Sequence, residues 1–106
     1  MNAFAALADP TRLRIVEMLA AGERGAGEIA GEFAMSGPAV SQHLKTLREA
    51  GLVTVRAEAQ RRIYTLDPQG FEALEDWLRR IRRFWGGRLD ELERQLRAAP
   101  DTGEIS

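Results

Sequence analysis

Two short helix signals separated by three residues constrain this chain more than any other feature of its sequence. Ser36 can cap a helix that ends at Gly51, and Pro38 suits the first turn of that helix. The apolar residues of this segment recur at helical spacing: Val40, Leu44 and Leu47. A shorter helical segment runs from Gly25 through Phe33. Since residues 34–36 join the two segments, the sequence predicts a helix-turn-helix.

Another helix is predicted before this unit. Asp9 and Pro10 form an N-cap followed by proline at the first helical position, and the apolar pattern after them continues for about three turns, up to Gly22. Phe4 and Leu7 precede this helix on a short helix or an arm.

Two β-prone runs follow the helix-turn-helix. They span residues 52–56 and 61–66, and residues 57–60 separate them, so they predict a two-stranded hairpin. The resulting fold class is mainly α with a small β-hairpin, in the order α-α-α-α-β-β-α. This is the order of a winged helix-turn-helix.

A long final helix begins after Asp67 and Pro68. Apolar residues step by three or four along it: Phe71, Leu74, Leu78, Ile81, Trp85, Leu89, Leu92 and Leu96. Gly86 and Gly87 are the expected site of a break or kink. Because such a stripe would leave apolar surface exposed on a monomer, we expect a homodimer.

Length and composition fit one ordinary globular domain. The chain has 106 residues, and we expect residues 1–97 to form a single domain and residues 98–106 a disordered polar tail. The opening residues 1–8 are apolar but too few for a membrane span or a secretion signal. No cysteine is present, so no disulfide can form. We therefore expect a cytoplasmic protein.

Positive charge is concentrated in the middle of the chain. The net charge of the whole chain is −1, but residues 36–66 carry five basic and two acidic residues and thus a net charge of +3. Each of the two flanking segments has an excess of acidic residues. A surface for nucleic acid is therefore expected in the middle segment.

The candidate contacts to DNA lie on the predicted second helix and on the hairpin. Small or planar polar groups suit base edges, and cations suit phosphates. The candidates on the helix are Ser36, Gly37, Pro38, Ala39, Ser41, Gln42, His43, Lys45 and Arg48. Those on the hairpin are Arg56, Arg61 and Arg62, which are expected to follow the DNA backbone or enter the minor groove.

Three stretches of the chain resemble the ArsR-type bacterial transcriptional regulators. They read ALADPTRLRIVEMLA, GEIAGEFAMSGPAVSQHLKTLREAGLVTVR and RRIYTLD, and together they cover most of residues 4–67. The resemblance implies a homodimeric DNA-binding repressor, with a recognition helix at residues 37–50 and a wing at residues 52–66. It also implies a dimer interface made by the first and last helices. The residues expected there are Phe4, Leu7, Phe71, Leu74, Leu78, Ile81, Trp85, Leu89 and Leu92.

The chain departs from the metal-sensing members of that family. Those members use a cysteine pair in the short helix, or Asp and His in the last helix, whereas this chain has no cysteine and His43 is its only histidine. It resembles the branch without metal ligands, so we expect no metal site and no cofactor. Gly37 stands where the family often carries a polar side chain. Residues 57–60 lack the usual glycine of the wing tip and include the acidic Glu58.

Other functions compete with DNA binding by a repressor. A protein-interaction module that has lost DNA binding is the alternative, because the wing tip is acidic and the net charge is negative. An enzyme is not expected, since His43 has no visible partner for acid–base chemistry. The sequence identifies no small-molecule effector. It also leaves two possibilities for Arg12, which can reach a phosphate or pair with a nearby acid.

Overall fold

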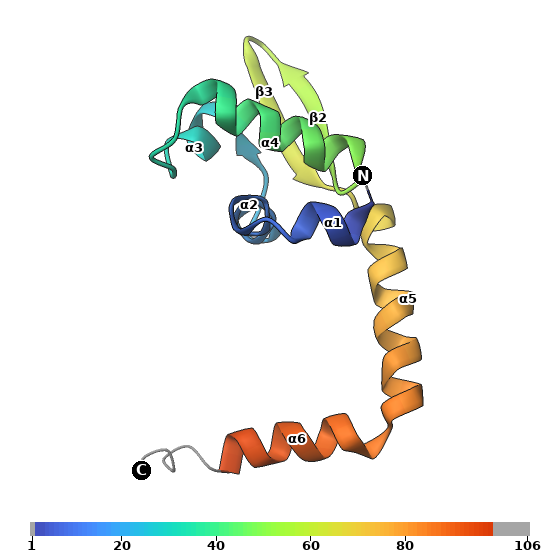
Figure 1. Cartoon of the computed structure of the whole chain (residues 1–106). Coiled ribbons are helices and arrows are strands. Elements are labelled where there is room, and N and C mark those ends of the chain that lie inside the picture. The colour runs from blue at the N-terminus through green and yellow to red at the C-terminus, as the bar shows by residue number, and fades with distance from the viewer. Residues whose placement is uncertain (1, 99–106) are drawn as a thin grey trace. The chain divides into compact units, whose positions relative to one another are not determined.

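The helices and strands follow the predicted order, with one strand added and the final helix divided in two (Figure 1). The structure is a computed structural model that describes residues 2–98, so the predicted polar tail lies outside the described residues except for Ala98. The helices are α1 (Ala3–Leu7), α2 (Pro10–Ala20), α3 (Ala26–Ala30), α4 (Gly37–Glu49), α5 (Pro68–Trp85) and α6 (Gly87–Ala98). The strands are β1 (Arg24–Gly25), β2 (Val53–Glu58) and β3 (Arg61–Leu66).

The chain divides into two compact units, residues 1–74 and residues 75–106. The first unit contains the helix-turn-helix, the sheet and the start of α5, and the second contains the rest of α5 and α6. The single domain expected over residues 1–97 stays a prediction. No helix among the described residues is both long enough and apolar enough to cross a membrane.

Short polar side chains cap the N-termini of α2 and α4, as the sequence predicts. The Asp9 carboxylate accepts hydrogen bonds from the backbone amides of Thr11 at 2.9 Å and Arg12 at 3.0 Å. Ser36 Oγ accepts from the amide of Ala39 at 3.3 Å. These bonds satisfy amides that lack partners within the helix, and they confirm the predicted starts of α2 and α4. Residues 4–7 lie in α1, a short helix rather than an arm.

Helix α3 is shorter than the sequence predicts. Glu28 accepts a hydrogen bond from the amide of Gly25 at 2.7 Å, as expected for half of a capping box. The helix ends at Ala30, however, and the predicted extension through Phe33 is wrong. The amide of Phe33 bonds to the carbonyl of Ala30 at 3.2 Å, a tighter turn than an α-helix makes. Phe33 packs against the core from this turn.

The predicted hairpin belongs to a three-stranded antiparallel sheet with the order β1-β3-β2. Strand β1 pairs Arg24 with Tyr64 and Gly25 with Ile63. The sequence predicted no strand there, because a two-residue strand has no alternating pattern that could identify it. The extra pairing joins the base of the hairpin to the residues that lead into α3.

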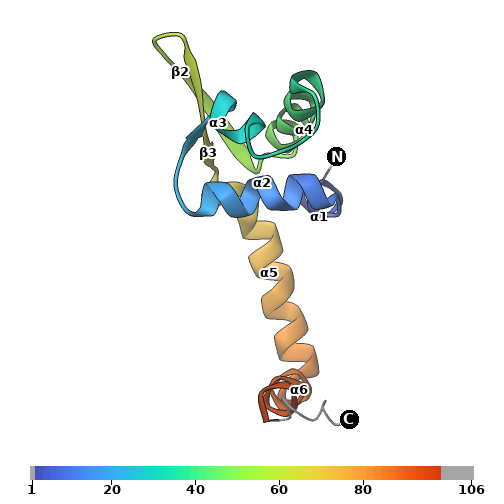
Figure 2. The same cartoon turned by 90° about the vertical axis from the view of Figure 1, so that its left-hand side faces the viewer.

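The hairpin turn is tighter than predicted. Strand β2 continues to Glu58, so Ala59 and Gln60 alone form the turn, and the predicted four-residue connection at 57–60 is wrong. Ala59 adopts a φ of 59°, a left-handed conformation that is uncommon for a residue other than glycine. The closed end of the hairpin projects beyond α3 and α4 (Figure 2).

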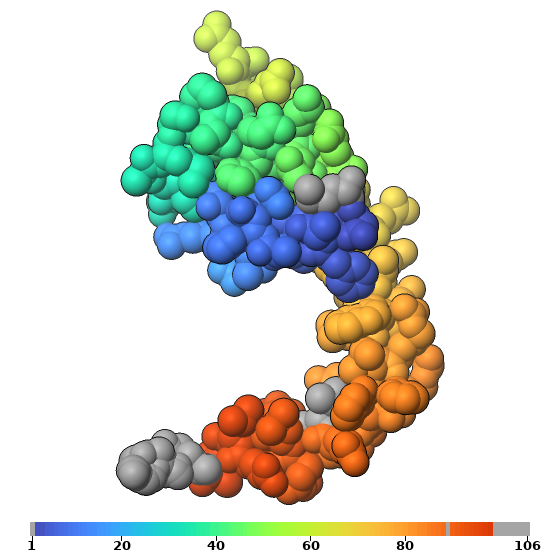
Figure 3. All heavy atoms as spheres, viewed as in Figure 1, coloured from blue at the N-terminus to red at the C-terminus, as the bar shows by residue number. Residues whose placement is uncertain are grey.

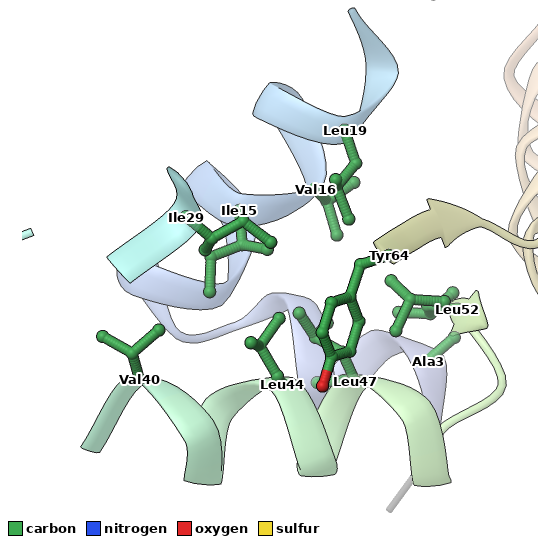
Figure 4. Packing of buried hydrophobic residues seen from close by; sticks show 12 residues of the cluster. Ala3, Ile15, Val16, Leu19, Ile29, Val40, Leu44, Leu47, Leu52 and Tyr64 are labelled. Carbon is green, nitrogen blue, oxygen red and sulfur yellow. The ribbon is translucent and has the colours of Figure 1, made fainter. Parts of the chain in front are cut away.

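One hydrophobic core holds the first unit together. Side chains from α1, α2, α3, α4 and the sheet meet in it, and Figure 4 shows Tyr64 extending from β3 toward Leu44 and Leu47 of α4. The largest fully buried side chains are Ile15, Ile29, Val40, Leu47, Leu52 and Val53. Burial of each stabilises the fold by roughly 1.5 to 3 kcal/mol. The core therefore fixes α4 on one side and leaves its other side at the surface.

The final helical segment breaks where two glycines were predicted to interrupt it. Helix α5 ends at Trp85, and α6 begins at Gly87. Gly86 between them has a φ of 47°, which side-chain-bearing residues rarely adopt. The predicted break is therefore confirmed.

Gly70 lies close against the backbone of Gly51. It lies in the first turn of α5, and a Cβ on it would lie 1.8 Å from the carbonyl oxygen of Gly51. Gly51 follows α4 directly, so this contact joins the start of α5 to the end of α4. Neither backbone segment can move away without disturbing the core residues beside it, such as Leu52.

We expect Gly70→Ala to destabilise the protein strongly. The added methyl group collides with backbone, and overpacking of this kind typically costs about 1 to 3 kcal/mol, occasionally more. Gly27→Ala is the matched control, because a Cβ at Gly27 would meet no atom within 4 Å. Urea unfolding followed by circular dichroism measures both variants. Equal stability of Gly70→Ala and the wild type would contradict the close approach.

Candidate nucleic-acid interface

The side of α4 that faces away from the core is polar and accessible. Val40, Leu44 and Leu47 are buried. The exposed residues of this helix include Ser41, Gln42, Lys45 and Arg48. Two of these carry neutral hydrogen-bonding groups and two carry positive charge, so the face can offer hydrogen bonds and cations to one ligand.

The start of α4 leaves room for close approach. Ser36 uses its hydroxyl to cap the helix, while Gly37 and Pro38 are exposed and Ala39 is half-buried. A Cβ on Gly37 would meet no atom within 4 Å. The missing side chain therefore relieves no clash within the chain, and it leaves the backbone at the first turn of the helix open to a ligand.

Three cationic side chains line a recess between α4 and β3, which we call the α4–β3 recess. Its volume is about 260 Å³, and its lining includes Ser41, Lys45, Arg48, Arg62 and Tyr64. A neighbouring recess of about 210 Å³ shares Arg48 and Arg62 with it. Within the described part of the chain, no hydrogen bond or ion pair engages the side chains of these three cations. Their charge is available to an anion from outside.

The other two hairpin arginines are paired within the chain. Arg56 donates to both carboxylate oxygens of Glu23 at 2.9 Å and to Glu58 at 3.5 Å. Arg61 donates to Glu28 at 3.3 Å. The Arg56 hydrogen bond lowers the pKa of Glu23, and the same bond raises the pKa of Arg56. Both pairs are at the surface.

Sequence reasoning missed the acidic partners of these arginines. Glu23 and Glu28 lie 33 residues before Arg56 and Arg61 along the chain. Strand β1 brings them together, because it pairs residues 24–25 with β3. Since β1 itself was not predicted, no local signal in the sequence could have indicated these ion pairs.

His43 does not share the exposed face of α4 with Ser41 and Gln42. Its side chain is 21% exposed, and its Nδ1 lies 3.2 Å from an Arg12 guanidinium nitrogen and 3.9 Å from an Asp9 carboxylate oxygen. Figure 3 shows α4 in green lying directly against α1 and α2 in blue on this face of the first unit. The structure thus directs His43 toward α2 rather than toward an external ligand.

The side chain of Arg12 turns toward groups of its own chain, which argues against the phosphate contact that the sequence left open. Its Nε donates to the backbone carbonyl of Ala6 at 2.7 Å, and its guanidinium also reaches His43. Asp9 accepts from the backbone amide of Arg12. This bond lowers the pKa of Asp9, and the charge of Arg12 acts in the same direction.

The fold and this surface together define a winged helix-turn-helix DNA-binding protein. Its second helix presents polar groups and cations, and a hairpin with a further unpaired arginine follows it. The family model described as the bacterial regulatory protein arsR family matches residues 9–55. The chain belongs to this family, and it is a DNA-binding transcriptional regulator, a class of proteins that are not enzymes.

Known relatives support this assignment along most of the chain. The chain is 52% identical over 84 residues to the HTH-type transcriptional regulator Rv2034 of Mycobacterium tuberculosis, covering 79% of this chain and 76% of that protein. It is 34% identical over 77 residues to the transcriptional repressor SdpR of Bacillus subtilis, covering 73% and 86%. The crystal structure of a possible transcriptional regulator for arsenical resistance superposes with a TM-score of 0.72 at 41% identity, covering 87% and 93%.

We expect the unpaired and paired hairpin arginines to differ in DNA binding. Arg62→Gln removes an available cation, so it lowers affinity for all duplexes and reduces the slope of log K against log salt by about 0.9. The control is Arg56→Gln combined with Glu23→Gln, which removes an ion pair and keeps the net charge. Fluorescence anisotropy across a salt series measures both slopes. An equal reduction in both proteins would contradict the distinction between the two arginines.

Proposed function

We propose that this chain is a homodimeric repressor that binds an inverted-repeat operator and blocks transcription. The observation that carries the proposal is the polar face of α4 beside the unpaired cations of the α4–β3 recess. Base edges are read by small or planar polar groups, and phosphates attract cations, so this surface suits the major groove of duplex DNA. The likeness to the repressor SdpR supports the repressor role.

The exposed residues of α4 divide into two roles in this proposal. Gln42 pairs with the edge of an adenine, and Ser41 bonds to a neighbouring base. Ala39, which is half-buried beside the open start of α4, contacts a thymine methyl group. Lys45 and Arg48 then bind phosphates at the edge of the groove. Affinity comes mainly from the phosphates and specificity from the bases.

The hairpin arginines also fall into two groups, one that binds phosphate and one that is paired within the chain. Arg62 lines the α4–β3 recess together with Lys45 and Arg48, so we assign it to a phosphate. We do not assign Arg56 and Arg61 to phosphates in this proposal, because Glu23 and Glu28 pair with them within the chain. In this proposal both pairs stiffen the hairpin against the residues around β1. Such a hairpin follows the DNA backbone at a fixed angle.

The dimer is proposed to form through apolar surface on the helices. Helix α5 has no buried residue, although apolar residues recur along its whole length. Leu78 is 51% exposed, Phe84 83% and Leu96 71%, and Trp85 and Leu92 are also exposed. Ile81 is half-buried, and the side chain of Leu89 lies outside the described residues. A partner chain covering this stripe would remove a large apolar area from water.

Other residues predicted for the dimer interface contribute less exposed surface. Phe4 on α1 is exposed, and we keep it at the edge of the proposed interface. Leu7, Phe71 and Leu74 are partly buried and pack against the core of their own unit. We therefore place the centre of the proposed interface after residue 74.

The structure weakens one of the two reasons for the rival proposal of a protein-interaction module. Glu58, the acidic residue at the wing tip, accepts a hydrogen bond from Arg56 and so has a partner within the hairpin.

A regulator that acts on bacterial DNA works in the cytoplasm, which is where we place this protein. We assign it no metal or cofactor, and a small-molecule effector is not identified.

The first test concerns sequence reading by Gln42. The probe is the duplex that the wild type enriches from a random-sequence library, compared with a scrambled duplex. Gln42→Ala is expected to weaken binding to the enriched duplex by about 1 to 3 kcal/mol and to change binding to the scrambled duplex little. Gln69→Ala, at an exposed glutamine outside α4, is the matched control. Equal losses on both duplexes would show that α4 does not read sequence.

The second test concerns the dimer. Sedimentation equilibrium of the wild type at micromolar concentration is expected to give a dimer. Trp85→Ala is expected to weaken dimerisation by roughly 3 kcal/mol, because truncation of a large aromatic side chain leaves a cavity in an apolar interface. Arg80→Ala, at an exposed residue on the same helix, serves as the control. A wild-type monomer under these conditions would rule out the homodimer.

A further inference from the structure

Four polar groups from three helices meet behind the recognition face of α4. They are the backbone carbonyl of Ala6 in α1, the carboxylate of Asp9 at the start of α2, the guanidinium of Arg12 in α2 and the imidazole of His43 in α4. We call these four groups the Arg12–His43 cluster. The proposed function assigns no role to it.

The chemistry of the cluster assigns a direction to its bonds. The guanidinium of Arg12 can only donate, so Nδ1 of His43, 3.2 Å away, accepts. The imidazole is then neutral and carries its proton on Nε2. Arg12 donates in a second direction through Nε to the carbonyl of Ala6. The planar guanidinium of Arg12 thus bridges α1 and α4. The backbone amide of Arg12 donates a capping hydrogen bond to Asp9, and this bond fixes the backbone position from which the side chain extends.

The position of His43 on α4 gives this bridge a functional consequence. His43 follows Gln42 directly, so the bond to Arg12 is made one residue from the proposed base contact. The core holds α4 through apolar contacts, which are non-directional and so oppose small rotations about the helix axis less than a directional bond does. A directional hydrogen bond to a charged donor is not tolerant of such rotations, because its strength falls steeply as the angle changes.

We propose that Arg12 and His43 are positioning residues that fix the rotation and depth of α4, so that Ser41 and Gln42 meet the base edges. This inference rests on the proposed DNA-reading function of α4. It adds a connection between α1 and the helix that reads sequence, because Arg12 bonds to both. In this scheme neither positioning residue touches DNA.

The test compares two replacements of His43, which are His43→Asn and His43→Leu. The asparagine side chain keeps an acceptor near the position of Nδ1, whereas the leucine side chain removes it. The first measurement is hydrogen exchange of the α4 amides in the protein without DNA. His43→Leu is expected to speed exchange in the first half of α4 about tenfold, and His43→Asn to keep it near the wild-type rate.

The second measurement is binding to the enriched and scrambled duplexes. His43→Leu is expected to lower affinity for the enriched duplex at least about fivefold, with little change on the scrambled duplex, and His43→Asn to retain most of the wild-type preference. Arg12→Gln is expected to match His43→Leu, and the double variant to lose no more than either single variant. Arg14→Gln is the control, since Arg14 is exposed on the same helix as Arg12 and carries the same charge.

The outcomes separate this inference from the proposed function. If the wild type shows no preference between the duplexes, the proposed function fails, and the exchange rates still decide whether the bond positions α4. If the wild type discriminates and His43→Leu does so equally, the positioning role is overturned. Identical behaviour of His43→Asn and His43→Leu in both measurements also overturns it, because the acceptor is then irrelevant.

Discussion

Burial of one face of α4 is the constraint on which the rest of this structure depends. Val40, Leu44 and Leu47 lie in the common core, where they meet side chains from the other helices and Tyr64 of the sheet. Because those residues point inward, the helical repeat places Ser41, Lys45 and Arg48 about 100° around the helix from them, at the surface. The polar surface of α4 is thus a geometrical result of core packing.

The positive charge that this protein offers to a ligand depends on which cations are paired within the chain, and less on its net charge. The chain as a whole is slightly acidic, yet the cations of the α4–β3 recess stay unpaired among the described residues while Arg56 and Arg61 have carboxylate partners. An acidic balance is therefore compatible with DNA binding when acids neutralise some arginines and leave others free. Net charge alone would have favoured a different class of partner.

The sequence predicts those parts of the fold that local chemistry determines. Asp9 and Ser36 cap helices through bonds to amides two or three residues away, and Gly86 interrupts a helix through its own backbone. The face of α4 likewise follows from the spacing of its apolar residues. Each of these signals is complete within a few neighbouring residues.

Strand β1, the ion pairs of the hairpin and the direction of His43 depend instead on contacts between distant segments. Strand β1 exists only because β3 pairs with it, and the partners Glu23 and Glu28 come with that pairing. His43 has the composition of a DNA contact, but its direction is decided by Arg12, which lies 31 residues away.

The three-stranded sheet also determines how this wing can change over evolution. Beside the hairpin, β1 pairs with β3 and leads directly into α3, so insertions there disturb the helix-turn-helix. At its tip, Ala59 and Gln60 are exposed and lie outside the paired residues of the sheet. Length and sequence can therefore vary at the tip of the hairpin while the strands paired with β1 and the helix-turn-helix stay unchanged.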